Sequence, residues 1–507
     1  MVIGAGIGGL TTAALLAQAG CRVTVLEAGA YPGGSAGTFY HRGFRFEAGA
    51  TLAGGFQPGG PHALIANRLG IEWPVQPAHP AWVVHLPDRQ VTLTRDNADV
   101  LRQFPHTARF WTEQQRIADL GWSMASHSVP WPPASGVELL QLVRVGLSHF
   151  PDDLRLLPFA FRAVRQWLQR HHLERDTVFV RLLDALLLIS AQTTSSFANA
   201  LYSATALDLP RQGVYHVQDG IGSLAQTLAD QIQALGGQVL YKHRVTKIDV
   251  IDGRVVGMQV LRGHRSAEYF ACDFAVANLT PWSLDELLGD ASPSRLRRDV
   301  QHLKFGWGAF VLYLGVHDAQ LPPDLPDHHQ VITDMQGPLG EGRSLFVSLS
   351  PGWDTSRAPA GQRAVTVTTH TAIQPWWDLL AQDHEAYEAH KAEYTDRILA
   401  AIERAIPGFG RSVSRVMSGT PVTYQTWTHR HLGMVGGFPQ VSLFKARGPR
   451  TGLVNLRMVG DSIFPGQSTA GVTAGALRVA NDIQHALPHR SRRSIFCRRT
   501  SESPSYD

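Results

Sequence analysis

The sequence predicts a mixed α/β fold in which a nucleotide-binding domain is assembled from pieces that lie far apart along the chain. Two strand–loop–helix patterns support this prediction, one at residues 2–20 and the other at residues 454–484. A third segment, residues 219–260, has the pattern of a helix, a Gly-Gly turn and alternating strands. The long stretches between these pieces must then form a second domain, which their patterns predict to be helical with a mixed sheet.

The chain opens MVIGAGIGGLTTAALLAQAGCRVTVLEAG. Val2-Ile3 is the end of an apolar strand. Because few residues precede the loop, we expect either that the first half of this strand is encoded upstream of the given start or that the first strand is short. A G-x-G-x-x-G loop follows, and then LTTAALLAQAG is apolar at helical spacing and closed by Gly20. CRVTVLE predicts a second strand ending at Glu27. This order of strand, glycine loop, helix, strand and acid is the context that a dinucleotide-binding loop requires.

Each residue of the loop has its own part in binding a diphosphate. Gly4 permits the tight turn, Gly6 lets the backbone approach the diphosphate, and Gly9 lets helix and strand pack closely. The helix N-terminus, where Gly8 lies, supplies free N–H groups and partial positive charge. Glu27 can accept hydrogen bonds from a ribose 2′-hydroxyl, and its charge disfavours a 2′-phosphate.

Composition and charge narrow the class of protein. Hydrophobic residues make up 44% of the 507 residues and charged residues 17%, which is below the ~25% usual in soluble domains. The low charge fits either a large core or work on an apolar substrate. The net charge is +4, and arginines gather in the tail HRSRRSIFCRRTSESPSYD. The rest of the chain is near neutral, which argues against nucleic-acid binding.

Cysteine and histidine patterns predict no metal site. The three cysteines, Cys21, Cys272 and Cys497, are far apart, so we expect no disulfide framework and a reducing compartment. The 23 histidines include no H-E-x-x-H pattern. The sequence contains no run of 18 or more apolar residues, so it predicts no transmembrane helix. Because the N-terminus is the nucleotide loop rather than a signal peptide, we expect the protein to stay in the cytoplasm and not to be secreted.

The stretch after Glu27 indicates which nucleotide is bound. It reads AGAYPGGSAGTFYHRGFRFEAGAT. This stretch resembles the extended N-terminal signature of two-dinucleotide-binding-domain flavoproteins. In those proteins the Gly-Gly loop and the turn that follows it lie along FAD. The resemblance therefore implies that Gly33, Gly34, Gly49 and Thr51 contact FAD.

Two further segments imply the same cofactor. In LVNLRMVGDSIFPGQSTAGVTAGALRVANDI, an apolar strand runs into Gly460-Asp461, which in such flavoproteins binds the ribityl chain. Gly471-Val472 opens a helix, whose N-terminus near the flavin pyrimidine would stabilise negative charge on the reduced ring. In the segment at 219–260, the strand around Val245 would place a backbone amide against the adenine.

These signals predict a discontinuous Rossmann-like FAD domain and a substrate domain that faces the membrane. Within the first insertion, PFAFRAVRQWLQRH at 158–171 is expected to be one helix with Phe161, Val164 and Leu168 on one face. Such a helix suits a membrane interface or a core. LLDALLLISA at 182–191 is expected in the core or in a pocket wall. GAFVLYLGV and RSLFVSLS are expected to form strands of a mixed sheet over a substrate cavity. The predicted boundaries are 1–80, 205–280 and 420–485 for the FAD domain, 81–204 and 281–419 for the substrate domain, and 486–507 for a disordered basic tail.

The two ends of the chain together resemble the phytoene desaturase-related family of carotenoid desaturases and isomerases. The resemblance rests on GAGIGGL…LEAGAYPGGSAGTFYHRGFRFEAGAT, on TPVTYQTWTHRHLGMVGGFPQ and on GDSIFPGQSTAGVTAGA. SAGTF…GATLAGGFQPGG and PGQSTAGV look most like the cyanobacterial-type C-3′,4′ desaturase branch, which acts on monocyclic carotenoids. The resemblance implies an FAD-dependent oxidoreductase that removes a hydride equivalent and a proton from a C–C bond beside a polyene.

This resemblance also implies partners. A carotenoid substrate comes from a bilayer, so we expect peripheral attachment to the cytoplasmic side of a membrane. Electrons from the reduced flavin would pass to a quinone or to oxygen. No Ser-His-Asp set or carboxylate pair stands out in the sequence, so the catalytic acid or base is unknown.

Three departures from the family pattern bear on the function. Glu47 stands where Asp is usual, and Ser468 stands where Gly is common after Gln467. Ser35 stands where many desaturases carry Arg, and the isomerase branch also uses Ser there. Cis–trans isomerisation by reduced FAD is therefore the nearest alternative. An amine or protoporphyrinogen oxidase, and a non-catalytic prenyl-binding protein like the Rab GDP-dissociation inhibitors, are the others.

Overall fold

The glycine loop lies at the centre of a five-stranded parallel sheet. The computed structural model describes residues 1–126, 130–148, 156–263, 266–302 and 306–487. The first strand pairs on both sides with parallel neighbours. The sheet order is β19 (Leu456–Met458), β13 (Ala275–Ala277), β1 (Val2–Ile3), β2 (Thr24–Leu26) and β9 (Gln238–Leu240).

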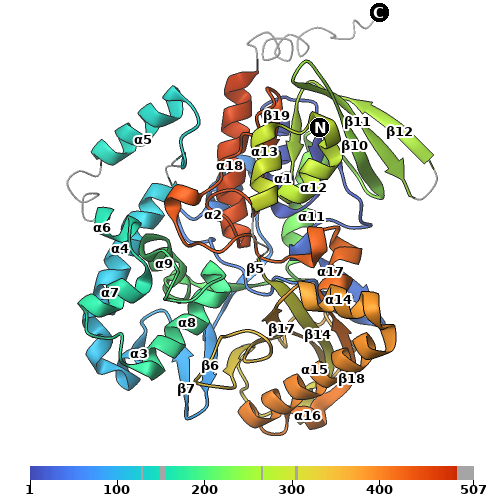
Figure 1. Cartoon of the computed structure of the whole chain (residues 1–507). Coiled ribbons are helices and arrows are strands. Elements are labelled where there is room, and N and C mark those ends of the chain that lie inside the picture. The colour runs from blue at the N-terminus through green and yellow to red at the C-terminus, as the bar shows by residue number, and fades with distance from the viewer. Residues whose placement is uncertain (127–129, 149–155, 264–265, 303–305, 488–507) are drawn as a thin grey trace, which may run out of the picture.

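Three helices pack together around this sheet, and they come from both ends and the middle of the chain (Figure 1). Helix α1 (Ile7–Gln18) contacts both α11 (Gly222–Ala234) and α18 (Thr469–Ala486). The small residues of α1, such as Ala13 and Ala14, are fully buried and let these helices approach closely. A mixed α/β fold with a discontinuous nucleotide-binding sheet is thus confirmed.

An antiparallel meander follows the third piece of the sheet. It consists of β10 (His243–Ile251), β11 (Arg254–Arg262) and β12 (Ser266–Ala271). Helices α12 (Pro281–Leu288) and α13 (Ser294–His302) come after β13 and share the same hydrophobic core. Helix α2 (Pro61–Leu69) contacts both α1 and α18.

A seven-stranded mixed sheet forms the second half of the molecule, below the first sheet in Figure 1. Its pairs are antiparallel except β15 with β6. The predicted strands GAFVLYLGV and RSLFVSLS are β14 and β16. One face packs on α14 (Gln374–Gln382) and α15 (His384–Ala405). The strand order is β18 (Val413–Gly419), β14 (Gly308–His317), β17 (Gln362–Thr371), β16 (Ser344–Leu349), β15 (His328–Ile332), β6 (Trp82–Leu86) and β7 (Arg89–Leu93).

Short elements connect the two halves. Two short antiparallel pairs are the hairpin of β3 (Thr38–His41) with β4 (Phe44–Glu47), and β5 (Val75–Ala78) with β8 (Val214–Val217), which comes from far along the chain. Helix α10 (Leu209–Gln212) precedes β8, α16 (Phe409–Ser412) precedes β18, and α17 (Pro421–Thr428) follows it.

The first insertion is helical and has its own core. LLDALLLISA lies in α8, where Leu182, Leu183 and Leu187 are fully buried, as predicted. None of the described helices has the length and apolarity to cross a bilayer. The helices are α3 (Ala98–Gln103), α4 (Ala108–Ser126), α5 (Gly136–Ser148), α6 (Leu157–Ala160), α7 (Val164–Arg170), α8 (Thr177–Ala191) and α9 (Ala200–Ala206).

The prediction of one helix over 158–171 is wrong. The chain forms α6 and α7, with extended backbone at Ala163 between them (φ −81°, ψ 159°). The backbone N–H of Val164 donates to Ala198 O at 2.9 Å, and that of Arg165 donates to Ser195 O at 2.8 Å. These bonds to a neighbouring loop replace the bonds that a continuous helix would make. Phe161 consequently does not share a buried face with Val164, and 70% of its surface is exposed.

The predicted tail, residues 486–507, lies outside the described residues from position 488 onward. The domain boundaries given above stay predictions.

Candidate cofactor and substrate site

One cavity of about 2110 Å³ runs from the glycine loop to the helical insertion. Its lining comes from the five-stranded sheet at one end and from α4, α8, α9 and the seven-stranded sheet at the other. Of the residues predicted to bind FAD, all but Gly9 line it. They are Gly4, Gly6, Gly8, Glu27, Gly33, Gly34, Gly49, Thr51, Val245, Gly460, Asp461, Gly471 and Val472.

The geometry of the loop explains why its glycines are required. Gly4 has φ +90°, which favours glycine. A Cβ on Gly6 would lie 2.5 Å from Asn278 Nδ2, and one on Gly9 would lie 2.4 Å from Gly4 O. Gly9 therefore serves the close packing of helix on strand, away from the cavity. The bare backbone at Gly4 and Gly6 leaves the space that a diphosphate needs.

Asn278 is a residue of this site that sequence reasoning missed. It directly follows β13, whose Ala277 pairs with Ile3, so it lies beside the first residue of the glycine loop. A Cβ on Gly460 would be 2.6 Å from Asn278 Oδ1. Asn278 thus joins the loop at the end of β1 to the loop after β19. The sequence signal that could have identified Asn278 is its position at the carboxyl end of a parallel strand, where ligands bind in such sheets.

Glu27 faces the glycine loop. Its Oε2 accepts a hydrogen bond from Ala5 N at 2.7 Å, and its Oε1 accepts one from Gly29 N at 2.6 Å. Burial raises the pKa of Glu27, and these hydrogen bonds oppose that rise. Val245 lies near this acid, because His243 N at the start of β10 donates to Glu27 O at 2.7 Å. The acid and the strand predicted to contact adenosine are thus neighbours.

The Gly-Gly turn is attached directly to the glycine loop. Gly33 N donates to Ala5 O at 2.8 Å, and Gly33 and Gly34 have φ +111° and +55°. Gly49 also depends on having no side chain, because its Cβ would lie 1.9 Å from Tyr424 Oη. Tyr424, from α17, is buried and lines the cavity, and no sequence pattern identified it as a site residue.

Glu47 has a structural place outside the cavity lining. Its buried carboxylate pairs with Arg357 at 2.9 Å and accepts hydrogen bonds from Ile221 N and Thr38 Oγ1. Ile221 directly precedes α11, so the carboxylate attaches the start of this helix to β4. The departure at this position therefore acts on the framework of the site.

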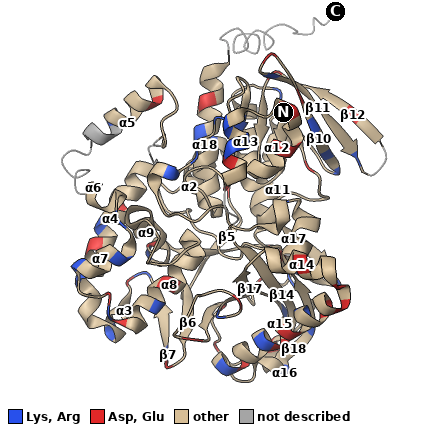
Figure 2. Cartoon of the chain, in the orientation of Figure 1, with Lys and Arg blue, Asp and Glu red and all other residues tan. Residues whose placement is uncertain are grey.

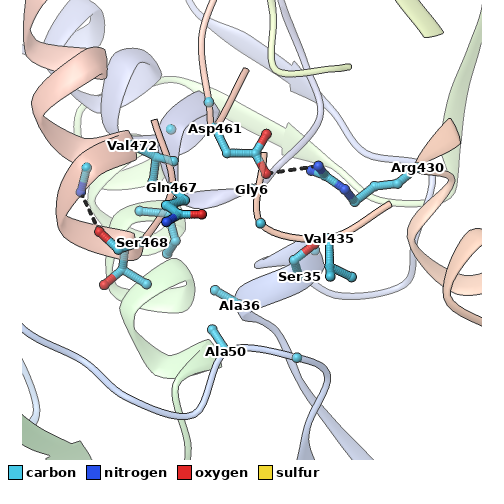
Figure 3. A pocket seen from close by; sticks show the side chains of 18 of the residues that line it. Gly6, Ser35, Ala36, Ala50, Arg430, Val435, Asp461, Gln467, Ser468 and Val472 are labelled. Atoms are coloured by element: carbon cyan, nitrogen blue, oxygen red, sulfur yellow. Dashed lines mark hydrogen bonds and ion pairs between the residues drawn. The ribbon is translucent and has the colours of Figure 1, made fainter. Parts of the chain in front are cut away.

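The C-terminal segment brings a helix start and a charged pair to the cavity (Figure 3). Asp461 Oδ2 lies 2.9 Å from Arg430 Nη2. Ser468 caps α18 through a hydrogen bond from Gly471 N to its Oγ at 3.0 Å. Ser468 has φ +75°, in the left-handed region that favours glycine. The side chain at this position therefore costs backbone strain but satisfies one N–H of the helix start.

The other end of the cavity is apolar. Trp122, Leu201 and Phe346 are among its walls, and none of the lining residues described between 121 and 209, or between 309 and 370, is acidic, Lys or Arg. His370 lies in this wall, and burial lowers its pKa to about 4, so its imidazole is neutral near pH 7. Burial also raises the pKa of Tyr202 and Tyr313. This end suits an uncharged, extended ligand.

An exposed apolar surface lies at this end of the cavity. The Phe161 ring stacks on Phe444 with centroids 4.9 Å apart, and Trp131 meets Phe444 edge-on at 5.8 Å. All three line the cavity. Helix α5 adds exposed Val137 and other aliphatic side chains. Figure 2 shows charges of both signs over α15, whereas α5 is mostly uncharged. We call residues Trp131, Val137, Leu139, Leu140, Val143, Leu157, Phe161 and Phe444 the apolar rim.

Sequence comparisons agree with this geometry. The family model described as flavin containing amine oxidoreductase matches residues 7–484. Prolycopene isomerase 2 of an Oncidium hybrid cultivar is 29% identical over 95% of this chain and 83% of its own. Prolycopene isomerase of Daucus carota is 28% identical, with 95% and 79% covered. A lycopene-forming phytoene desaturase of a Paracoccus species is 24% identical, with 95% and 96% covered.

Solved structures share the fold. An oxidoreductase from Methanosarcina mazei superposes with a TM-score of 0.65 at 17% identity, covering 95% of this chain and 99% of that one. Cyclohexylamine oxidase from Brevibacterium oxydans gives a TM-score of 0.58 at 16% identity, with 95% and 98% covered. At these identities the likeness shows the architecture alone.

Proposed function

We propose, from the premise that this chain belongs to the flavin-containing amine oxidoreductase family, that it is an FAD enzyme acting on a carotenoid. One observation carries the proposal. The cavity that begins at a glycine loop suited to a dinucleotide continues into a long apolar end whose described walls hold no acidic, Lys or Arg residue between 121 and 209 or between 309 and 370. A polyene fits such walls because it has no charge to pair.

The residues present fit FAD. The backbone of Gly4–Gly9 would hold the diphosphate, Glu27 the adenosine ribose and Asp461 the ribityl chain. The start of α18 would lie at the ring, where its N–H groups favour negative charge. When bound, the flavin supplies the hydride or electron chemistry. The apolar walls orient the polyene and exclude water, and His370 in these walls stays uncharged.

Two reactions on a carotenoid fit this site, and two observations favour cis–trans isomerisation. The prolycopene isomerases are 28–29% identical to this chain, against 24% for the Paracoccus desaturase over a similar share of it. Ser35 is the residue of the isomerase branch at that position. Desaturation, with C-3′,4′ as the bond, is the second candidate, and the sequence PGQSTAGV favours it. It would require a quinone or oxygen as electron acceptor.

The apolar rim supports peripheral attachment to a membrane, which we propose for the cytoplasmic face. A carotenoid is dissolved in the bilayer, and a rim of aromatic and aliphatic side chains at the cavity would let it enter without crossing water. Phe161 is 70% and Val137 74% exposed, so these groups are available to lipid.

The experiment compares pigments. The chain is expressed in bacterial cells that make a cis-configured carotenoid and, separately, in cells that make a monocyclic one, with Gly6→Asp as the control that blocks the glycine loop. Unchanged mass with altered retention and a changed cis band would establish an isomerase. Loss of two hydrogens with a red-shifted spectrum would establish a desaturase, and fragmentation would locate the bond. Identical pigments in wild type and Gly6→Asp, with flavin present in the wild type, would contradict the carotenoid proposal.

A further inference from the structure

We propose that Arg430 supplies the positive charge opposite the diphosphate of the bound FAD. This inference rests on the cofactor of the proposed function but not on the carotenoid. It assigns a binding role to a residue that the glycine-loop and Gly-Asp motifs do not include.

The charge of the site calls for such a residue. Three carboxylates, Glu27, Glu286 and Asp461, already line the described cavity. The FAD diphosphate brings about two more negative charges, whereas the N–H groups at the start of α1 offer only about half a positive charge. A full positive charge near the loop would offset this imbalance.

Four Lys or Arg residues line the described cavity, and three of them have other places. Arg478 donates to Trp131 O at 2.6 Å and to Pro132 O at 2.7 Å, beside Glu138. Lys242 and Arg244 lie beside Val245 at the start of the meander, where adenine is expected. Arg430 is the fourth.

The guanidinium of Arg430 is held next to the glycine loop. Its Nε donates to Met434 O at 2.6 Å, and its Nη2 lies 2.9 Å from Asp461 Oδ2. Gly460, the residue before Asp461, packs on the loop so tightly that a Cβ on Gly8 would be 3.1 Å from Gly460 Cα. Nη2 is buried against Asp461, but Arg430 also lines the cavity, and a guanidinium has five N–H donors, so further N–H groups are left to donate to a phosphate oxygen.

The same guanidinium lies near the turn at Ser35, where many desaturases carry Arg. Tyr424 connects the two places. The Cβ position of Gly49 is 1.9 Å from Tyr424 Oη and 3.1 Å from Ser35 O, which puts the tyrosine hydroxyl against this turn. Figure 3 shows Arg430 reaching toward Asp461 on the side of the cavity where Gly6 and Ser35 lie. Arg430 and this turn therefore lie on the same side of the cavity.

The rival role for Arg430 is to hold Asp461 for the ribityl chain. Three ligands separate the two roles. FAD contains both the diphosphate and the ribityl chain, ADP contains the adenosine diphosphate part without the ribityl chain, and riboflavin contains the ribityl chain and ring without the diphosphate. Flavin-free protein is titrated with each, by flavin fluorescence for FAD and riboflavin and by calorimetry for ADP. Wild type is compared with Arg430→Gln and with Asp461→Asn.

We expect Arg430→Gln to lower the affinity for FAD and for ADP by about 10-fold or more, as is usual when a charge-assisted hydrogen bond is lost. Riboflavin binding should stay within about 2-fold. Asp461→Asn should show the reverse pattern, weakening riboflavin and leaving ADP unchanged. Salt should weaken FAD binding less in Arg430→Gln than in wild type, because one ionic contact is gone.

Equal losses for FAD and riboflavin with unchanged ADP binding would overturn the proposal and leave Arg430 as a positioning residue for Asp461. Thermal unfolding monitors folding of each variant. If Arg430→Gln does not fold, Arg430→Lys is used in its place, since it keeps the charge but loses the planar fork. Arg430→Lys should lower the affinities for FAD and ADP equally, by less than the 10-fold expected for Arg430→Gln, and should leave riboflavin affinity unchanged. Any other pattern counts against the diphosphate contact. None of these measurements uses a carotenoid, so a failed pigment assay leaves the result interpretable.

Discussion

Asn278 occupies the place that a side chain at Gly6 would need, since a Cβ on Gly6 would be 2.5 Å from Asn278 Nδ2. We therefore expect Gly6→Ala to reduce bound flavin per protein by about 10-fold or more. The double variant Gly6→Ala/Asn278→Ala, in which the Asn278 side chain is shortened, should recover part of the bound flavin. Flavin absorbance of purified protein measures both. If the double variant binds no more flavin than the single one, the clash with Asn278 is not the cause.

Asp461 lies at the end of β19 with its carboxylate in the cavity. Asp461→Ala should lower flavin occupancy and pigment conversion together, because it removes the predicted acceptor for the ribityl hydroxyls. Absorbance and the pigment assay are read on the same preparation. Unchanged flavin content would show that the ribityl chain is held elsewhere.

Ser468 combines a helix cap with a strained backbone, so two substitutions should lower stability to different extents. Ser468→Ala loses the hydrogen bond from Gly471 N and keeps φ +75°, which should cost roughly 1–2 kcal/mol of unfolding free energy. Ser468→Gly loses the same bond but relieves the strain, so it should be within about 0.5 kcal/mol of wild type. Denaturant unfolding ranks the three proteins. Equal losses in both variants would refute the strain.

Buried neutral histidines should make the fold sensitive to mild acid. Burial lowers the pKa of His62 to about 3 and that of His85 to about 4, below the 6.5 of an exposed histidine. Between pH 6.5 and 4 the unfolded chain binds protons that the folded one does not, so stability falls as pH falls. Each such histidine contributes roughly 1.4 kcal/mol per pH unit at most.

His62 stacks on Phe56 with centroids 4.6 Å apart, so phenylalanine is a fitting replacement. The unfolding temperature of His62→Phe should fall less than that of wild type between pH 6.5 and 4. The control is His384→Phe at an exposed position, which should leave the dependence of the unfolding temperature on pH unchanged. A slope in His62→Phe equal to that of wild type would assign the acid sensitivity to other groups.

The apolar rim gives a direct test of membrane attachment. Phe161→Glu/Phe444→Glu should lower the membrane-bound fraction several-fold in flotation with lipid vesicles, because it places two charges where lipid would lie. Tyr269→Glu, at a 56% exposed position of β12, is the matched control and should float like wild type. Equal flotation of all three proteins would remove the rim as the contact surface.

The parts of the site that local sequence determines could be predicted. A glycine loop between a strand and a helix has few structural solutions, and Gly4, Gly6 and Glu27 lie where this motif implies. Asn278 and Arg430 could not be found in this way, because strand order and a loop after α17 bring them to the loop from distant positions.

The broken helix at 158–171 has a similar cause. Its periodicity is helical, yet Val164 and Arg165 donate their N–H groups to Ala198 and Ser195, partners on a loop that only the tertiary fold places there. Periodicity reports which residues prefer the interior, but it does not report where a neighbouring loop competes for backbone hydrogen bonds. The same limit applies to Phe161, which is apolar and at helical spacing but exposed.

The strand order has a consequence for how the protein is made. β1 leaves the ribosome before its neighbour β13, which follows after some 270 residues, and before β19, which follows after some 450. Until β13 has been synthesised, the glycine loop has only β2 as a paired strand beside it. Because domains fold as units once their parts are present, cofactor loading should come only after β13 and β19 have been synthesised. Supplying riboflavin late in expression would then rescue flavin content as well as supplying it early.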